Sequence, residues 1–131
     1  MKLDKLLIVD DDDDIRYSIK AALQQHGIDA LEARDGNCAI AMVGTKNISG
    51  IILDIMMPKR SGILVLEYIR TRFDFDKPIF VLTANESNRL KLNASIYGLS
   101  GYYTKPFNVT EMVDEIVRTL MAENSTVAAE P

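Results

Sequence analysis

Short aliphatic runs alternate along the chain with longer stretches in which apolar residues recur at helical spacing. The first run, Leu6 to Val9, has no polar alternation, which is typical of a parallel strand buried on both faces. The run over residues 28–33 is more polar, which favours a place at the edge of a sheet. In chain order, the pattern predicts strands at residues 6–9, 28–33, 51–53, 79–82 and 101–104.

Each predicted strand is followed by a segment with the periodicity of an amphipathic helix. Polar or acidic residues of the kind that cap helices stand near the start of these segments. The predicted starts, in chain order, are Asp14, Asp35, Ser61, about Glu86 and Asn108. Gly27 is expected to end the first helix, and the fourth is expected to run to about Tyr97.

Strands that alternate with helices in this way predict an α/β fold built on a parallel sheet. Right-handed crossovers then place helices on both faces of the sheet. A chain of 131 residues is long enough to form one domain with its own core. Because the helical periodicity ends near Met121, we expect a domain over residues 1–121 and a short disordered or frayed tail over residues 122–131.

The net charge of −4 comes largely from one run of five aspartates, Asp10 to Asp14, and the rest of the chain is nearly neutral. There is no general basic surface for nucleic acid and no polybasic membrane anchor, so neither partner is expected. The single cysteine, Cys38, cannot form an internal disulfide. The aliphatic run before the aspartates is too short for a signal peptide or a membrane span, and a cytoplasmic protein is expected.

Candidate chemistry lies just after the strands, because parallel sheets bind ligands beyond the carboxyl ends of their strands. The residues at these positions are Asp10, Asp11, Asp54, Thr83 and Lys105. If the first and third strands are neighbours, three carboxylates meet there and repel one another strongly. Oxygen ligands of this kind favour a hard divalent cation, with Mg²⁺ the leading choice and Mn²⁺ a possible substitute.

A carboxylate, a divalent metal, a lysine and a hydroxyl together suit phosphoryl transfer. Asp54 is the better nucleophile because its following neighbours are apolar, whereas the clustered Asp10 and Asp11 are better metal ligands. The product would be an aspartyl phosphate.

Four segments in chain order carry a resemblance to a known family. They are Leu6-Leu-Ile-Val-Asp-Asp11, Leu53-Asp-Ile-Met-Met-Pro58 followed by Gly62, Val81-Leu-Thr-Ala84 and Tyr102-Tyr-Thr-Lys-Pro-Phe107. From Lys5 to about Leu120 the chain resembles the receiver domains of bacterial response regulators, the CheY-like superfamily. The resemblance implies a doubly wound, five-stranded parallel sheet of order 2-1-3-4-5, the flavodoxin-like (βα)5 receiver fold.

The resemblance implies a role for each carboxylate. Asp54 matches the phosphoacceptor, which takes its phosphoryl group from a sensor histidine kinase or a histidine phosphotransfer protein. Asp10 and Asp11 match the acidic pair that holds Mg²⁺, and the backbone carbonyl of Met56 matches the group that completes the metal shell. In a run of five aspartates this register could instead fall on Asp11 and Asp12.

The resemblance also implies a switch. Thr83 and Lys105 match residues that bind phosphoryl oxygens, Tyr102 matches a rotating aromatic residue, and Lys105–Pro106 matches a cis peptide. The face formed by the fourth helix, fifth strand and fifth helix is then expected to change its contacts with an unidentified output protein. A monomer or a phosphorylation-dependent dimer is expected.

Three other functions fit the sequence less well. A phosphatase of the haloacid-dehalogenase type needs a second aspartate where Met56 stands, and a flavodoxin-like carrier would set an FMN phosphate against the aspartate run. No helix-turn-helix pattern follows Leu120, so DNA binding by this chain alone is not expected. We expect a phosphoacceptor switch rather than an enzyme, in a stand-alone receiver. The alternative is a receiver excised from a longer regulator with a DNA-binding or enzymatic output.

Overall fold

A five-stranded parallel sheet forms the centre of the molecule, and its strands lie in the order β2-β1-β3-β4-β5. The computed structural model describes residues 5–57, 61–84 and 88–129. The strands are β1 (Lys5–Val9), β2 (Ala30–Ala33), β3 (Ile48–Asp54), β4 (Ile79–Thr83) and β5 (Gly101–Thr104). The helices are α1 (Asp13–Gln25), α2 (Gly36–Thr45), α3 (Gly62–Arg72), α4 (Asn88–Ser95) and α5 (Val109–Ala129). The predicted α/β class and strand order are therefore confirmed.

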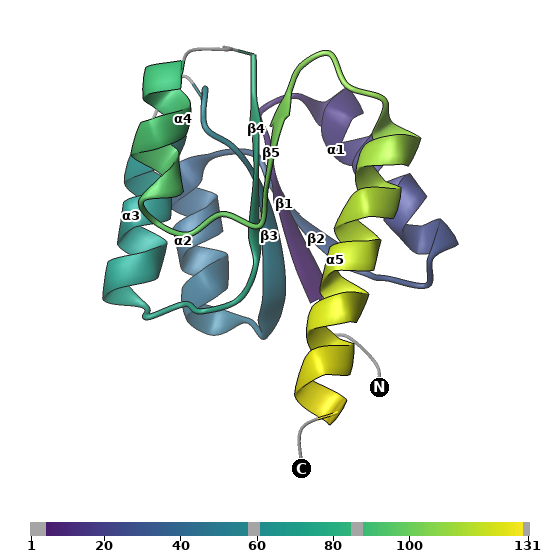
Figure 1. Ribbon diagram of the computed structural model, residues 1–131. Helices are drawn as coiled ribbons and strands as arrows, with labels where there is room; N and C mark the ends of the chain where they lie inside the picture. Colours follow the sequence, from purple (N-terminus) through teal and green to yellow (C-terminus); the bar gives the residue numbers. More distant parts are fainter. Residues whose placement is uncertain (1–4, 58–60, 85–87, 130–131) are drawn as a thin grey trace.

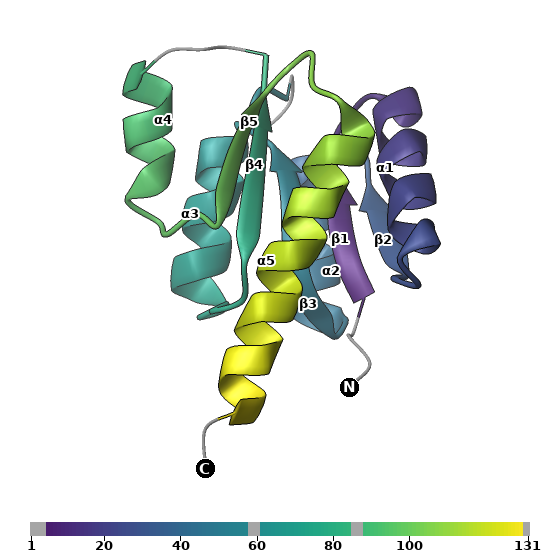
Figure 2. The ribbon, with the colours of Figure 1, turned by 45° about the vertical axis from the view of Figure 1, so that its right-hand side comes forward.

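Helices cover both faces of the sheet, with α2, α3 and α4 on one side and α1 and α5 on the other (Figures 1 and 2). Successive side chains of a strand point to opposite faces, so the unbroken aliphatic runs supply both layers of the core. Leu7 and Val9 of β1 pack in the layer under α2 and α3, whereas Leu6 and Ile8 pack in the layer under α1 and α5. β2 lies at the edge of the sheet and is only partly buried, as its polarity predicts.

The start of α1 differs from the prediction by two residues. Asp12, not Asp14, is the N-terminal cap, and its side chain accepts hydrogen bonds from the backbone N–H groups of Asp14 and Ile15 at 2.9 and 3.3 Å. Asp13 and Asp14 occupy the first helical turn, where negative charge is favoured by the helix dipole. In a run of identical residues the cap position is set by the backbone path and cannot be read from residue type.

Other boundaries moved for local reasons. β3 begins at Ile48, three positions before the predicted start, because the small residues Ser49 and Gly50 interrupt the aliphatic pattern while the backbone already pairs with β1. α4 ends at Ser95, before the predicted Tyr97, and Gly98 follows at φ 77°. The predicted start of this helix near residue 86 lies outside the described residues.

The predicted tail is the largest difference, because α5 continues to Ala129 and includes most of residues 122–131. Its last turns project beyond the sheet in both ribbon views (Figures 1 and 2). A helix that packing has already nucleated adds further turns at little cost, and those turns need no apolar periodicity of their own. The end of the periodicity near Met121 therefore does not mark the end of the helix. No described helix is long and apolar enough to cross a membrane.

One arginine ties the far end of α3 to two loops. The Arg70 guanidinium donates hydrogen bonds to the backbone carbonyls of Tyr97 (2.8 Å), Phe75, Lys77 and Gly98 (2.7 Å each). Two of these carbonyls belong to the loop before β4 and two to the turn that follows α4. Arg70 therefore holds the ends of α3 and α4 in place from a single side chain.

Replacing this arginine is expected to destabilise the fold. Arg70→Met keeps an apolar stem but leaves four carbonyls without their donor, so the free energy of unfolding is expected to fall by about 3 kcal/mol. Arg72→Met is the matched control, since among the described residues the Arg72 guanidinium contacts the Tyr68 ring alone, and a change within about 0.5 kcal/mol is expected. Urea denaturation measures both, and equal losses in the two variants would contradict the role given to Arg70.

Candidate functional site

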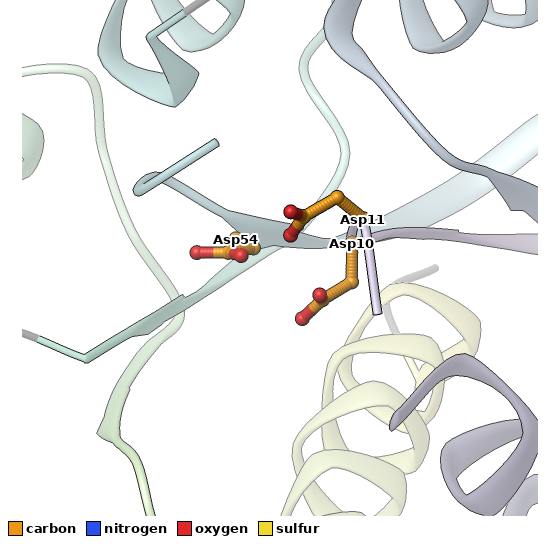
Figure 3. Close-up of side chains that lie close together, drawn as sticks. All are labelled: Asp10, Asp11 and Asp54. Atoms are coloured by element: carbon orange, nitrogen blue, oxygen red, sulfur yellow. The ribbon is translucent and has the colours of Figure 1, made fainter. Parts of the chain in front are cut away.

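Three carboxylates converge at the carboxyl ends of β1 and β3, which are neighbours in the sheet (Figure 3). Asp10 and Asp11 follow β1 and Asp54 ends β3, and oxygen atoms of all three lie within 4.8 Å of one another. Asp10 is fully buried and Asp54 is 2% exposed, whereas Asp11 is open to solvent and directs its carboxylate toward Asp54. The sheet order thus brings together the acidic residues predicted to meet there.

Lys105, just after β5, bridges the two buried carboxylates. Its Nζ lies 3.0 Å from Asp10 Oδ2 and 3.3 Å from Asp54 Oδ2. The remaining oxygen of each carboxylate accepts a backbone hydrogen bond at 2.9 Å, from Asp12 N–H to Asp10 and from Met56 N–H to Asp54. The orientation of both buried carboxylates is therefore fixed by their partners.

The electrostatics of the cluster leave an excess of negative charge. Burial raises the pKa of the Asp10 carboxyl, against the opposing effects of the Asp12 amide and Lys105. Burial acts to lower the pKa of Lys105, but the neighbouring carboxylates of Asp10 and Asp54 outweigh it and raise that pKa. One ammonium faces two buried carboxylates and the exposed Asp11, which is the donor set and charge that suit a hard divalent cation.

A hydroxyl and an aromatic ring lie on β4 and β5, the two strands beyond β3. Thr83 ends β4 and is fully buried, and Tyr102 lies on the adjoining β5. The Tyr102 hydroxyl is also buried; burial raises its pKa, and the nearby Thr83 side chain acts in the opposite direction. The Lys91 ammonium of α4 lies 5.4 Å from the centre of the Tyr102 ring, a cation–π contact.

Gly62 packs the start of α3 directly against the end of β3. A Cβ atom at this position would lie 2.2 Å from Ile55 Cα and 2.6 Å from the carbonyl oxygen of Asp54. The Gly62 N–H also donates to the Ile55 carbonyl at 3.2 Å. Only glycine allows this approach, so the backbone that carries Asp54 depends on residue 62. The sequence placed Gly62 in a motif but gave no reason for it.

Most of the predicted site residues come together. Asp10, Asp11, Asp54 and Lys105 form one cluster, with Thr83 and Tyr102 on the two strands beyond Asp54. Asp12 caps α1 instead of joining the cluster, which favours the register on Asp10 and Asp11. Lys105–Pro106 is cis, as the resemblance implies. The roles assigned to these residues, and to the Met56 carbonyl, stay predictions.

Comparison with known proteins settles the family. Residues 6–117 match the profile of the response regulator receiver domain. The chain belongs to this family. Response regulator MprA of Mycobacterium bovis is 32% identical over 126 residues, which cover 96% of this chain and 54% of MprA. This receiver domain thus spans about half the length of the curated relatives it matches.

Solved receiver structures share the fold over nearly their whole length. The receiver domain of the Francisella response regulator 1452 is 31% identical with a TM-score of 0.82, covering 92% of this chain and 99% of that one. Response regulator TrrA of Thermotoga maritima, solved in complex with Mg²⁺-BeF, is 32% identical with a TM-score of 0.77, covering 89% and 99%. This chain is therefore a receiver domain of the two-component systems, a family of phosphoacceptor switches.

Enlarging Gly62 is expected to disturb the end of β3. Gly62→Ala forces the backbone of residues 54–55 away from α3, and overpacking of this kind lowers the free energy of unfolding by about 2 kcal/mol. Gly27→Ala is the control: its φ of 73° carries a strain of about 1 kcal/mol, but no atom lies within 4 Å of the added carbon. Chemical denaturation and the amide shifts of residues 54–56 test this, and unchanged shifts in Gly62→Ala would contradict it.

The burial of Asp10 is expected to make the free energy of unfolding depend on pH. Because its folded-state pKa is raised above the ordinary 3.8, the folded protein holds this proton more tightly than the unfolded chain does. The resulting stability is present below pH 3.8 and is lost as pH rises through the raised pKa. Asp10→Asn, which stays neutral, is therefore expected to be more stable than the wild type at pH 7 without divalent metal, and the advantage is expected to shrink on acidification.

Thermal unfolding between pH 4 and pH 8 in EDTA measures this difference. Asp35→Asn is the control, because Asp35 caps α2 through one side-chain oxygen that asparagine keeps. Asp10→Asn that is less stable than the wild type at neutral pH would show that the bond to Lys105 outweighs the burial of the carboxylate.

Proposed function

We propose that Asp54 accepts a phosphoryl group, in a reaction that depends on a divalent cation, from a sensor histidine kinase or a histidine phosphotransfer protein. The observation that carries the proposal is the convergence of Asp10, Asp11 and Asp54 with Lys105 bridging the two buried carboxylates. An Asp54 oxygen attacks the phosphorus in line as the phosphorus–nitrogen bond of the donor breaks. The donor's histidine ring leaves with that electron pair and takes up a proton.

Asp10 and Asp11 are the proposed metal ligands, together with Asp54 and the backbone carbonyl of Met56. Their oxygens are the hard donors that Mg²⁺ prefers, and Mn²⁺ accepts the same set. The related TrrA was solved in complex with Mg²⁺-BeF, which supports this choice. When bound, the cation supplies positive charge that offsets the carboxylates and the oxygens of the transferring group. The exposed Asp11 leaves the cluster open to solvent on the side where a cation would enter.

Lys105 and Thr83 are the proposed partners of the transferred group. Lys105 carries a fixed positive charge beside Asp54, so it would bind one phosphoryl oxygen and balance the charge that develops during transfer. Thr83 stands on β4, the strand adjacent to Asp54, and its hydroxyl would bind a second oxygen. Neither residue forms or breaks a covalent bond in this role, which consists of positioning and charge stabilisation.

Phosphorylation is then proposed to move Thr83 toward Asp54 and let Tyr102 fill the space released. Thr83 and the Tyr102 hydroxyl are both buried, on neighbouring strands, so a shift of one residue changes the packing of the other. The surface that would change is formed by α4, β5 and α5. Leu92 on α4 and Ile96, directly after the end of α4, are 66% and 75% exposed, which gives this face an apolar surface for a partner. The change is a shift between two packings, and a partner must bind one of them more tightly.

The protein would thus be a switch rather than an enzyme with a substrate of its own, with only self-catalysed phosphotransfer and loss of the phosphoryl group. We place it in the cytoplasm, as a monomer or a phosphorylation-dependent dimer, with a protein as its output partner. We propose no contact with nucleic acid or membrane by this chain itself. The proposal concerns the receiver domain itself, and the curated relatives that it matches are about twice as long.

Intact-protein mass spectrometry tests the phosphoacceptor. Incubation with acetyl phosphate and MgCl2 is expected to add one phosphoryl group to the wild type, and EDTA is expected to prevent it. Asp54→Asn removes the nucleophile and is expected to abolish the gain, whereas Asp35→Asn, which caps α2 in another part of the molecule, is expected to label like the wild type. Continued labelling of Asp54→Asn would place the acceptor elsewhere, and no labelling of the wild type would contradict the proposal.

A further inference from the structure

The connection between β1 and α1, which carries the proposed metal ligands, is held from outside by one side chain. β1 ends at Val9 and α1 begins at Asp13, so only residues 10–12 join them. Arg16 lies one turn into α1 and folds back over this connection. Its Nη1 donates to the backbone carbonyl of Asp10 at 2.6 Å, and its Nη2 contacts the carboxylate of Asp13. One guanidinium therefore spans the connection from its first residue to the start of the helix.

A third contact anchors the guanidinium to the sheet. Arg16 Nε donates to Glu32 Oε1 on β2 at 3.1 Å, and the Arg16 side chain is only 11% exposed. Burial acts to lower the pKa of Arg16, but Asp13 and Glu32 outweigh it and raise that pKa, so the group stays charged. The fork of the guanidinium meets three acceptors from three places in the fold, which a lysine could not do.

The Asp10 carbonyl, which Arg16 binds, lies beyond the last paired residue of β1. The pairing of β1 with both of its neighbours ends at Val9, and the Asp10 N–H makes the last bond, to the Ala33 carbonyl at 3.1 Å. The Asp10 carbonyl therefore points past the sheet, where Arg16 supplies its donor. With the carboxylate of Asp10 held by Lys105 and the Asp12 amide, this bond fixes the peptide that joins Asp10 to Asp11.

We propose that Arg16, oriented by Glu32, is a positioning residue for divalent-cation binding: it holds the Asp10–Asp13 connection in the conformation that presents Asp10 and Asp11 to the metal. This inference rests on the proposed function, since it needs that metal site. Arg16 is not itself a proposed metal ligand. It acts through the backbone of a ligand residue, as outer-shell partners of metal ligands do.

Loss of the Arg16 charge and loss of its positioning contact are expected to change the affinity for Mg²⁺ in opposite directions. Removing a positive charge beside an acidic site strengthens its attraction for a cation, so a purely electrostatic effect of Arg16→Met would tighten Mg²⁺ binding. Loss of the positioning contact would instead weaken it, by about tenfold for an outer-shell partner. Lys20→Met is the matched control. Lys20 lies on the same helix and contacts the same Glu32 carboxylate at 3.4 Å, but it makes no described contact with residues 10–13.

Titration with MgCl2, followed by the amide chemical shifts of residues 10–13, measures the dissociation constant in each protein. We expect Arg16→Met to bind Mg²⁺ about tenfold more weakly than the wild type, and Lys20→Met to bind it within about twofold. Arg16→Lys keeps the charge but not the three-way fork, and Glu32→Met removes the oxygen that accepts from Arg16 Nε. Both variants are expected to have dissociation constants between these values. Thermal unfolding of each variant confirms that it is folded.

Mg²⁺ binding by the wild type tests the proposed metal site, and the difference between the wild type and the variants tests the role of Arg16. Wild-type protein that binds no Mg²⁺ would overturn the proposed function and this inference with it. Wild-type binding with equal or tighter binding by folded Arg16→Met would overturn the inference alone. Should Arg16→Met not fold, unchanged binding by both Arg16→Lys and Glu32→Met would overturn it equally.

Discussion

Two carboxylates buried on neighbouring strands, held to one ammonium from a third part of the chain, form the constraint on which this receiver depends. Asp10 and Asp54 could not share a water-poor position without Lys105, which reaches both of them. Lys105 follows β5, two strands from β3, so its side chain must reach past the end of β4 to bring the ammonium there. The hydrogen bond from the Lys105 N–H to the Thr83 carbonyl, at 2.7 Å, holds the Lys105 backbone beside β4.

The rest of the fold supplies the rigidity that such a site needs. Both faces of β1, β3 and β4 are covered by helices, and the side chains of these strands alternate between two apolar layers. The strand ends therefore cannot drift apart to relieve the repulsion between the carboxylates. Gly62 adds a direct contact between α3 and the backbone of Asp54, so even the exit from β3 has little freedom. Stability stored in the apolar layers thus offsets the cost of burying charge at one edge.

The sequence predicted those features that depend on residue type and missed those that depend on backbone path. The alternation of short apolar segments with helical periodicity located all five strands, and the strand-end rule pointed to Asp10, Asp11, Asp54, Thr83 and Lys105. The cap of α1 could not be chosen within a run of aspartates, and the last turns of α5 carry no apolar period. The bracing role of Arg16 was also missed. Its partner is a backbone carbonyl, which every residue has, and its anchor Glu32 lies on another strand.

The two proposed metal ligands from β1 are held very differently, and this difference divides their work. Both carboxylate oxygens and the carbonyl of Asp10 have partners, in Lys105, the Asp12 amide and Arg16. Asp11 is exposed, so its carboxylate keeps the rotamer freedom that Asp10 has lost. A cation entering the cluster would have to compete with Lys105 for Asp10, whereas it would meet Asp11 in water. In the proposed site, Asp10 would therefore set where the negative charge lies, and Asp11 would be the ligand that adjusts when a cation is gained or released.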